Sequence, residues 1–114
     1  MSDRNETLTL HVPYVNAGSA SFGGFESEGY TIKAPVRVGD EVLAGAKPDL
    51  IKIDVEGFEL RVVNGLKDMI AAAQPIIATE FFAENLERCG NIYRRATSAF
   101  QRSRLSGLWA IGDA

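Results

Sequence analysis

The spacing of hydrophobic and polar positions changes partway along the chain, and the first part predicts extended structure. Residues 7–12 alternate polar and apolar side chains, the period of a half-buried strand, and Pro13 closes this segment. A loop rich in glycine and serine follows over 14–29. Residues 30–38 are β-branched and aromatic enough for a second strand, and 39–46 predict only a short helical turn. We therefore expect a β-hairpin and loop region over residues 1–46.

The second part of the chain alternates strands and helices. The apolar run 50–53 predicts a buried strand, and apolar residues at helical spacing from Phe58 to Ala73 predict an amphipathic helix over 58–73, weakened at Gly65. Residues 75–82 predict the next strand, 84–104 a second helix and 108–111 a short last strand. Strand, helix, strand in this order implies parallel pairing. A βαβα core over 47–114 is expected, within a single α/β domain over residues 1–114.

Composition and charge narrow the class of protein. The net charge of −3 gives no reason to expect attraction to nucleic acid or to an acidic membrane. Cys89 is the single cysteine and cannot form an internal disulfide, and the sequence shows no Cys/His cluster at metal-site spacing. No apolar run approaches the roughly 20 residues that a membrane span needs, and residues 1–6 do not resemble a signal peptide. We expect a cytoplasmic protein.

Candidate chemistry gathers at the ends of two predicted strands. Asp54 and Glu56 follow the strand over 50–53, and Glu80 lies at the end of the next. Ligands of parallel α/β sheets bind outside the carboxyl ends of the strands, and in an extended segment Asp54 and Glu56 would point to the same side. Such carboxylates can bind a divalent cation, with Asp54 as its ligand, hold a hydroxyl or amine, or act as a general base.

A structural alternative exists for the same acids. Glu56 and Glu59 would favour the positive amino-terminal end of the helix that follows them, and Glu80 can be a strand-end residue without a chemical role. Stability alone explains Asp54 least well, because removing a carboxylate from water is costly.

The run from Asp49 to Leu66 (DLIKIDVEGFELRVVNGL) resembles the signature segment of the FkbM-family methyltransferases. Residues 75–80 and 7–22 resemble the segments that flank it, and the resemblance covers roughly residues 3–82. It implies a class I, Rossmann-like fold and methyl transfer from S-adenosylmethionine. Asp54 and Glu56 would lie on the acceptor or metal side, and Asp54, Glu56 and Glu80 would orient or deprotonate the acceptor.

The same resemblance implies a cofactor-binding half that the sequence does not match. Gly23 and Gly24 follow no buried parallel strand and precede no helix, so they do not fit the expected cofactor turn. We therefore expect a partial, truncated methyltransferase sheet, and we name no cofactor-binding residue. The strand over 50–53 would lack a neighbour. An unpaired edge on this strand would lead to self-association, to re-pairing with the N-terminal hairpin, to pairing with a missing N-terminal half or to poor stability.

The resemblance thus implies methyl transfer to an oxygen or nitrogen of a small molecule or sugar, with the isolated chain expected to be inactive. One alternative is a non-catalytic or split-enzyme α/β interaction module. A weaker one is a metal-dependent hydrolase that uses Asp54, Glu56 and Glu80.

Overall fold

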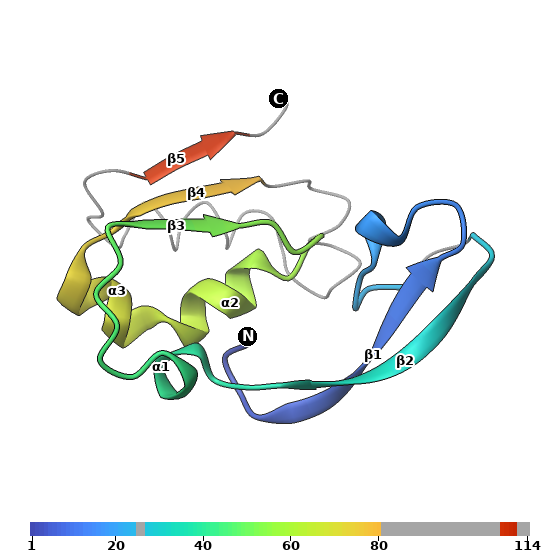
Figure 1. Cartoon of the computed structure of the whole chain (residues 1–114), viewed down its shortest axis with the longest axis horizontal. Coiled ribbons are helices and arrows are strands. Elements are labelled where there is room, and N and C mark those ends of the chain that lie inside the picture. Colours follow the sequence, from blue (N-terminus) through green and yellow to red (C-terminus); the bar gives the residue numbers. More distant parts are fainter. Residues whose placement is uncertain (25–26, 81–107, 112–114) are drawn as a thin grey trace.

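The computed structural model describes residues 1–24, 27–80 and 108–111, and in them the chain forms two separate β-sheets (Figure 1). The first is an antiparallel pair made of β1 (Glu6–Pro13) and β2 (Gly29–Val36). The second is parallel, in the order β3-β4-β5, and consists of β3 (Leu50–Ile53), β4 (Ile76–Glu80) and β5 (Leu108–Ile111). The predicted hairpin, the parallel pairing and the α/β class are confirmed.

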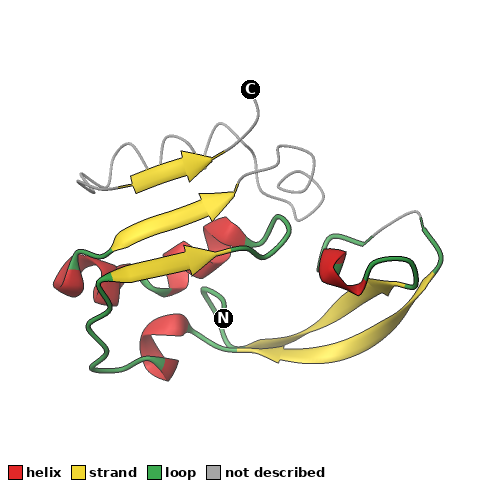
Figure 2. Cartoon of the chain, turned by 45° about the horizontal axis from the view of Figure 1, so that its top comes forward, coloured by secondary structure: helices red, strands yellow, loops and turns green. Residues whose placement is uncertain are grey.

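The hairpin is a ribbon that reaches away from the parallel sheet (Figure 2). β1 and β2 pair along their whole length, from Glu6 opposite Val36 to Pro13 opposite Gly29. The loop between them contains a short 3-10 helix, η1 (Ala17–Ser19). It then folds back on β1, where His11 and Ser21 exchange backbone hydrogen bonds of 2.9 and 3.0 Å. The expectation that the hairpin re-pairs the edge of β3 is wrong, because β1 and β2 satisfy each other in their own sheet.

The helix predicted over 58–73 is two helices, α2 (Glu59–Gly65) and α3 (Lys67–Ala73), which together cover one face of the parallel sheet (Figure 1). Leu66 joins them with φ −111° and ψ 12°. The N-terminal segment crosses α2 at this point, and a β-carbon on Gly65 would lie 1.8 Å from the carbonyl oxygen of Ser2. Gly65 therefore permits a close backbone approach that no other residue allows.

The start of α3 is capped from another element. α1 (Gly39–Val42) carries Asp40, whose carboxylate accepts hydrogen bonds from the backbone N–H groups of Asp68 (3.0 Å) and Met69 (2.9 Å). Early N–H groups of a helix have no partner within the helix, so this contact satisfies two of them. The helix break at Leu66 is thus stabilised from outside.

The hydrophobic core lies between the parallel sheet and the two helices. Ile53 and Ile77 face it from the sheet. The predicted helical positions are confirmed as core except Ala73, which is only half-buried; those in the core are Phe58, Val62, Leu66, Met69 and Ile70. The helix expected over 84–104 lies outside the described residues.

Arg61 on α2 ties the N-terminal segment to the core. Its guanidinium bonds to the carboxylate of Asp3 at 2.7 Å and to that of Glu6, and lies 4.7 Å from the centre of the Phe58 ring. Burial alone would raise the pKa of Asp3, but the hydrogen bond and charge of Arg61 outweigh it and hold that pKa below its ordinary value. The start of β1 is therefore fixed against α2.

We predict that Gly65→Ala destabilises the protein by about 2 kcal/mol or more, because Ser2 must move away from the new methyl group. The free energy of unfolding, measured by chemical denaturation, checks this. Asn64→Ala, at the exposed neighbouring position, is the matched control and should change stability by no more than about 0.5 kcal/mol. Equal effects of the two substitutions would contradict the close approach.

Candidate functional site

The candidate site is built on the turn between β3 and α2, which comprises residues 54–58. Within it Glu56 has φ 50° and Gly57 has φ 96°. Glycine adopts positive φ without cost, but for a residue with a β-carbon the left-handed region costs about 1–2 kcal/mol. Strained backbone of this kind persists only where the surrounding structure holds it.

Glu59 holds the turn from the first position of α2. Its Oε1 accepts hydrogen bonds from the backbone N–H groups of Gly57 (3.0 Å) and Val55 (3.3 Å), and the residue is only 2% exposed. Oε2 is also buried and has no hydrogen-bond partner among the described residues. The sequence predicted Glu59 only as a favourable charge at a helix start. Its position two residues after the turn glycine is the signal that could have indicated the bonds.

Ser21 holds the same turn from the hairpin loop. Its hydroxyl donates a hydrogen bond of 3.1 Å to the carbonyl oxygen of Glu56, 35 residues away in sequence. Next to this contact the Phe22 and Phe58 rings pack at 4.7 Å between centroids. The sequence places Ser21 only within the glycine- and serine-rich loop over 14–29 and does not indicate this role, because no local pattern encodes so distant a contact.

The predicted acids lie at one edge of the parallel sheet. β3 and β4 run in parallel with Ile53 opposite Thr79, so Asp54 and Glu80 are the next residues along their two strands. Asp54 is exposed, and its Oδ2 accepts a hydrogen bond of 3.0 Å from Lys52 Nζ. Glu56 is half-buried. The carboxyl ends of two strands thus bring Asp54 and Glu80 to the same edge.

The expectation that Asp54 and Glu56 point to the same side of an extended strand needs a correction. It assumed an extended segment, but β3 ends at Ile53 and Glu56 is left-handed. The direction of Glu56 is therefore set by the turn and by the contacts that hold it, not by the strand period.

We also tested whether the described residues fit a metal or the cofactor. They contain no group of three or more His, Cys, Asp or Glu side chains placed to hold a metal ion. Gly24 lies between two antiparallel strands, where an added β-carbon would be 3.7 Å from the His11 ring. It does not form a turn between a parallel strand and a helix, so we assign no described residue to the cofactor.

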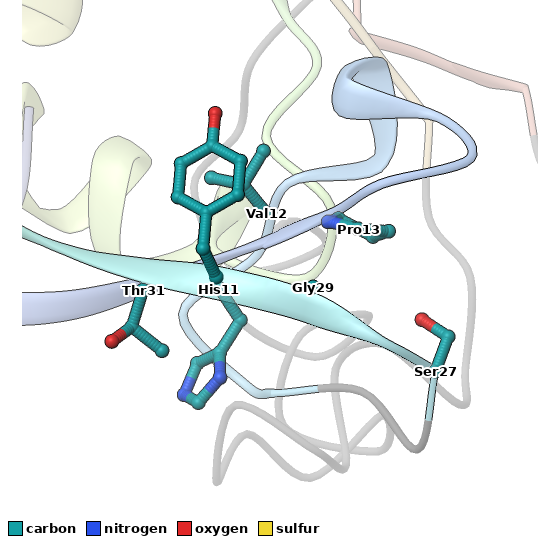
Figure 3. Close-up of a pocket in the computed structure, with 7 residues that line it drawn as sticks. His11, Val12, Pro13, Ser27, Gly29 and Thr31 are labelled. Carbon is teal, nitrogen blue, oxygen red and sulfur yellow. The ribbon is translucent and has the colours of Figure 1, made fainter.

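A shallow pocket lies elsewhere, on the hairpin (Figure 3). His11 and Thr31, which face each other in the strand register, project to the same side of the ribbon and line it together with Ser27. The pocket contains none of the predicted acids, and we assign it no role in the candidate site.

A parallel sheet with helices packed on one face defines an α/β domain. The family model of the methyltransferase FkbM domain matches residues 3–103. The chain belongs to this family, as its central segment indicated. Comparisons with curated proteins and with solved structures gave no match. In the described part of the chain, helices are too short or too polar to cross a membrane.

We predict that Glu56→Gly leaves the protein about 1 kcal/mol more stable than Glu56→Ala, because only glycine adopts φ 50° without strain. Both substitutions remove the carboxylate, so their difference in unfolding free energy isolates the backbone. The control is Ala71→Gly at an exposed position within α3, where glycine should instead lower stability by about 1 kcal/mol. Greater stability of the alanine variant at position 56 would refute the strain.

Proposed function

We propose that the protein serves in S-adenosylmethionine-dependent methyl transfer to an oxygen or nitrogen of a small molecule or sugar. One observation carries the proposal. The chain belongs to the FkbM methyltransferase family, and its turn from Asp54 to Gly57 lies at the carboxyl edge of a parallel sheet.

The carboxylates give this edge the chemistry that a methyl acceptor requires. A hydroxyl or amine that receives a methyl group must be oriented and must lose a proton, and a carboxylate can do both. Asp54 is exposed at the end of β3 and Glu80 ends the neighbouring strand. Glu56 lies in the strained turn that joins β3 to α2. We assign these three residues to the acceptor side of the reaction.

A divalent ion at Asp54 stays part of the proposal. Lys52 now neutralises this carboxylate, so an ion would have to displace the ammonium group. Loss of activity in a chelator, restored by Mg²⁺ or Mn²⁺, would support the ion. Within the described residues, nothing favours a metal-dependent hydrolase over methyl transfer.

A second candidate function is an interaction or split-enzyme module, and the edge of β3 with its exposed apolar neighbours favours it. Within the described residues β3 pairs only with β4, so no described strand pairs with its other edge. Leu50 and Ile76 are register partners, and both are exposed, at 62% and 49%. An apolar pair beside an open strand edge is the kind of surface to which another strand or a second copy of the chain can bind.

We predict that Asp54→Asn, Glu56→Gln and Glu80→Gln each lower kcat for methyl transfer by about 10²- to 10⁴-fold, because each removes a carboxylate that holds or deprotonates the acceptor. Transfer from radiolabelled S-adenosylmethionine at high concentration to a panel of hydroxyl and amine acceptors measures this. Asp49→Asn, at an exposed position just before the opposite end of β3, is the matched control and should retain full activity. Titration with S-adenosylhomocysteine reports separately on cofactor binding. Full activity in all three variants would overturn the assignment.

We predict that the purified chain associates with itself through Leu50 and the edge of β3, and that Leu50→Glu prevents this. A carboxylate at this position would have to be buried without a partner in the interface. Sedimentation velocity over a range of protein concentrations checks the change in mass. Ile32→Glu places the same charge on an exposed apolar position of the hairpin and should leave association unchanged. A wild-type chain that is monomeric at every concentration would contradict the prediction.

A further inference from the structure

The turn after β3 has three backbone polar groups held by side chains from two different elements. Glu59 accepts the N–H groups of Val55 and Gly57, and Ser21 donates to the carbonyl of Glu56. The held groups surround the one residue of the turn that has a β-carbon and a positive φ. A strained backbone conformation persists only where surrounding contacts hold it, and these three hydrogen bonds are such contacts.

The bonds of Glu59 differ from an ordinary helix cap. A capping side chain satisfies N–H groups within the first turn of its own helix, whereas α2 begins at Glu59 and the bonded N–H groups precede it. A buried carboxylate is costly, and hydrogen bonds to an ionised acceptor are about twice as strong as neutral ones. Its placement therefore serves the shape of the turn more than the start of the helix.

The direction of the Ser21 hydroxyl is fixed as well. Its oxygen accepts a hydrogen bond of 3.1 Å from the backbone N–H of Gly23, which leaves its proton to donate to Glu56. The contact between Phe22 and Phe58 keeps the loop in place beside the turn. A loop of the hairpin thus controls the conformation of a residue at the sheet edge.

We propose that Glu59 and Ser21 are positioning residues, which hold Glu56 in the left-handed conformation and thereby direct the acceptor-side carboxylates. This inference rests on the proposed function for its effect on catalysis, but not for its effect on the turn. It adds two residues, neither of which touches the acceptor, to the three assigned above.

Two measurements that do not depend on activity test the conformation. Amide hydrogen exchange reports on the N–H groups of Val55 and Gly57, and the three-bond HN–Hα coupling of Glu56 reports on its φ. In Glu59→Ala we expect exchange at these two amides to rise about tenfold or more. The Ile70 amide, bonded to Leu66 at 2.9 Å in the core, should keep its protection. Glu59→Gln retains an oxygen acceptor, so the amides of Val55 and Gly57 should keep most of their wild-type protection from exchange.

Ser21→Ala should change the Glu56 coupling and lower kcat by about 10- to 100-fold with little change in KM, since a small misplacement of a reacting group has this cost. Ser19→Ala in the same loop and Glu41→Gln on α1 are the matched controls. Their side chains bond to Asn16 and Asn5, remote from the turn, and both variants should behave as wild type.

The outcomes distinguish the positioning role of Glu59 and Ser21 from the proposed methyl-transfer function. Unchanged exchange and coupling in both Glu59→Ala and Ser21→Ala would overturn the positioning inference, as would altered exchange with full kcat. If the wild-type protein transfers no methyl group, either alone or together with a fragment that supplies the cofactor-binding half, the proposed function fails. The conformational role then stands or falls on exchange and coupling alone.

Discussion

The carboxylate of Glu59 is the contact on which the candidate site depends. It is buried at the start of α2, and its Oε1 bonds to two amides of the turn that precedes the helix. A carboxylate that leaves water loses strong solvation, and among the described residues its hydrogen bonds to two backbone amides compensate for this loss. The turn thereby keeps Glu56 in the left-handed conformation, which a residue with a β-carbon does not favour by itself. The shape of the sheet edge depends on this interaction together with the contact of Ser21.

The hairpin takes part in the same arrangement, although it forms a separate sheet. An isolated two-stranded hairpin is at best marginally stable in water, so β1 and β2 require support from the rest of the protein. Support comes at the base from the bonds of Arg61 to Asp3 and Glu6, and near the loop from the contact of Ser21 with Glu56. The loop that needs support is therefore the loop that holds the strained turn. Stability of the hairpin and geometry of the site are coupled through shared contacts.

The sequence predicted the elements well where periodicity decides them. Alternation identified β1, the apolar run identified β3, and helical spacing identified the core side chains of α2 and α3. The break at Leu66 was only hinted at by Gly65, because its cause is the passage of Ser2, which is distant in sequence. Asp54 and Glu80 were placed at the correct edge by the parallel pairing. Ser21 and Glu59 were missed as holding residues, since their roles depend on tertiary contacts that no local pattern encodes.

The two ends of β3 differ in chemistry, and this difference connects the proposed activity with the proposed association. The amino end presents Leu50 next to Ile76, an exposed apolar pair, whereas the carboxyl end presents Asp54. Lys52 lies between them and pairs with Asp54, so a charged side chain stands on the open edge. Charged residues on an edge strand oppose indiscriminate pairing, while an apolar pair favours contact with a partner. A partner bound at Leu50 and Ile76 would therefore leave the acidic end open to solvent, and association would not block access to the carboxylates.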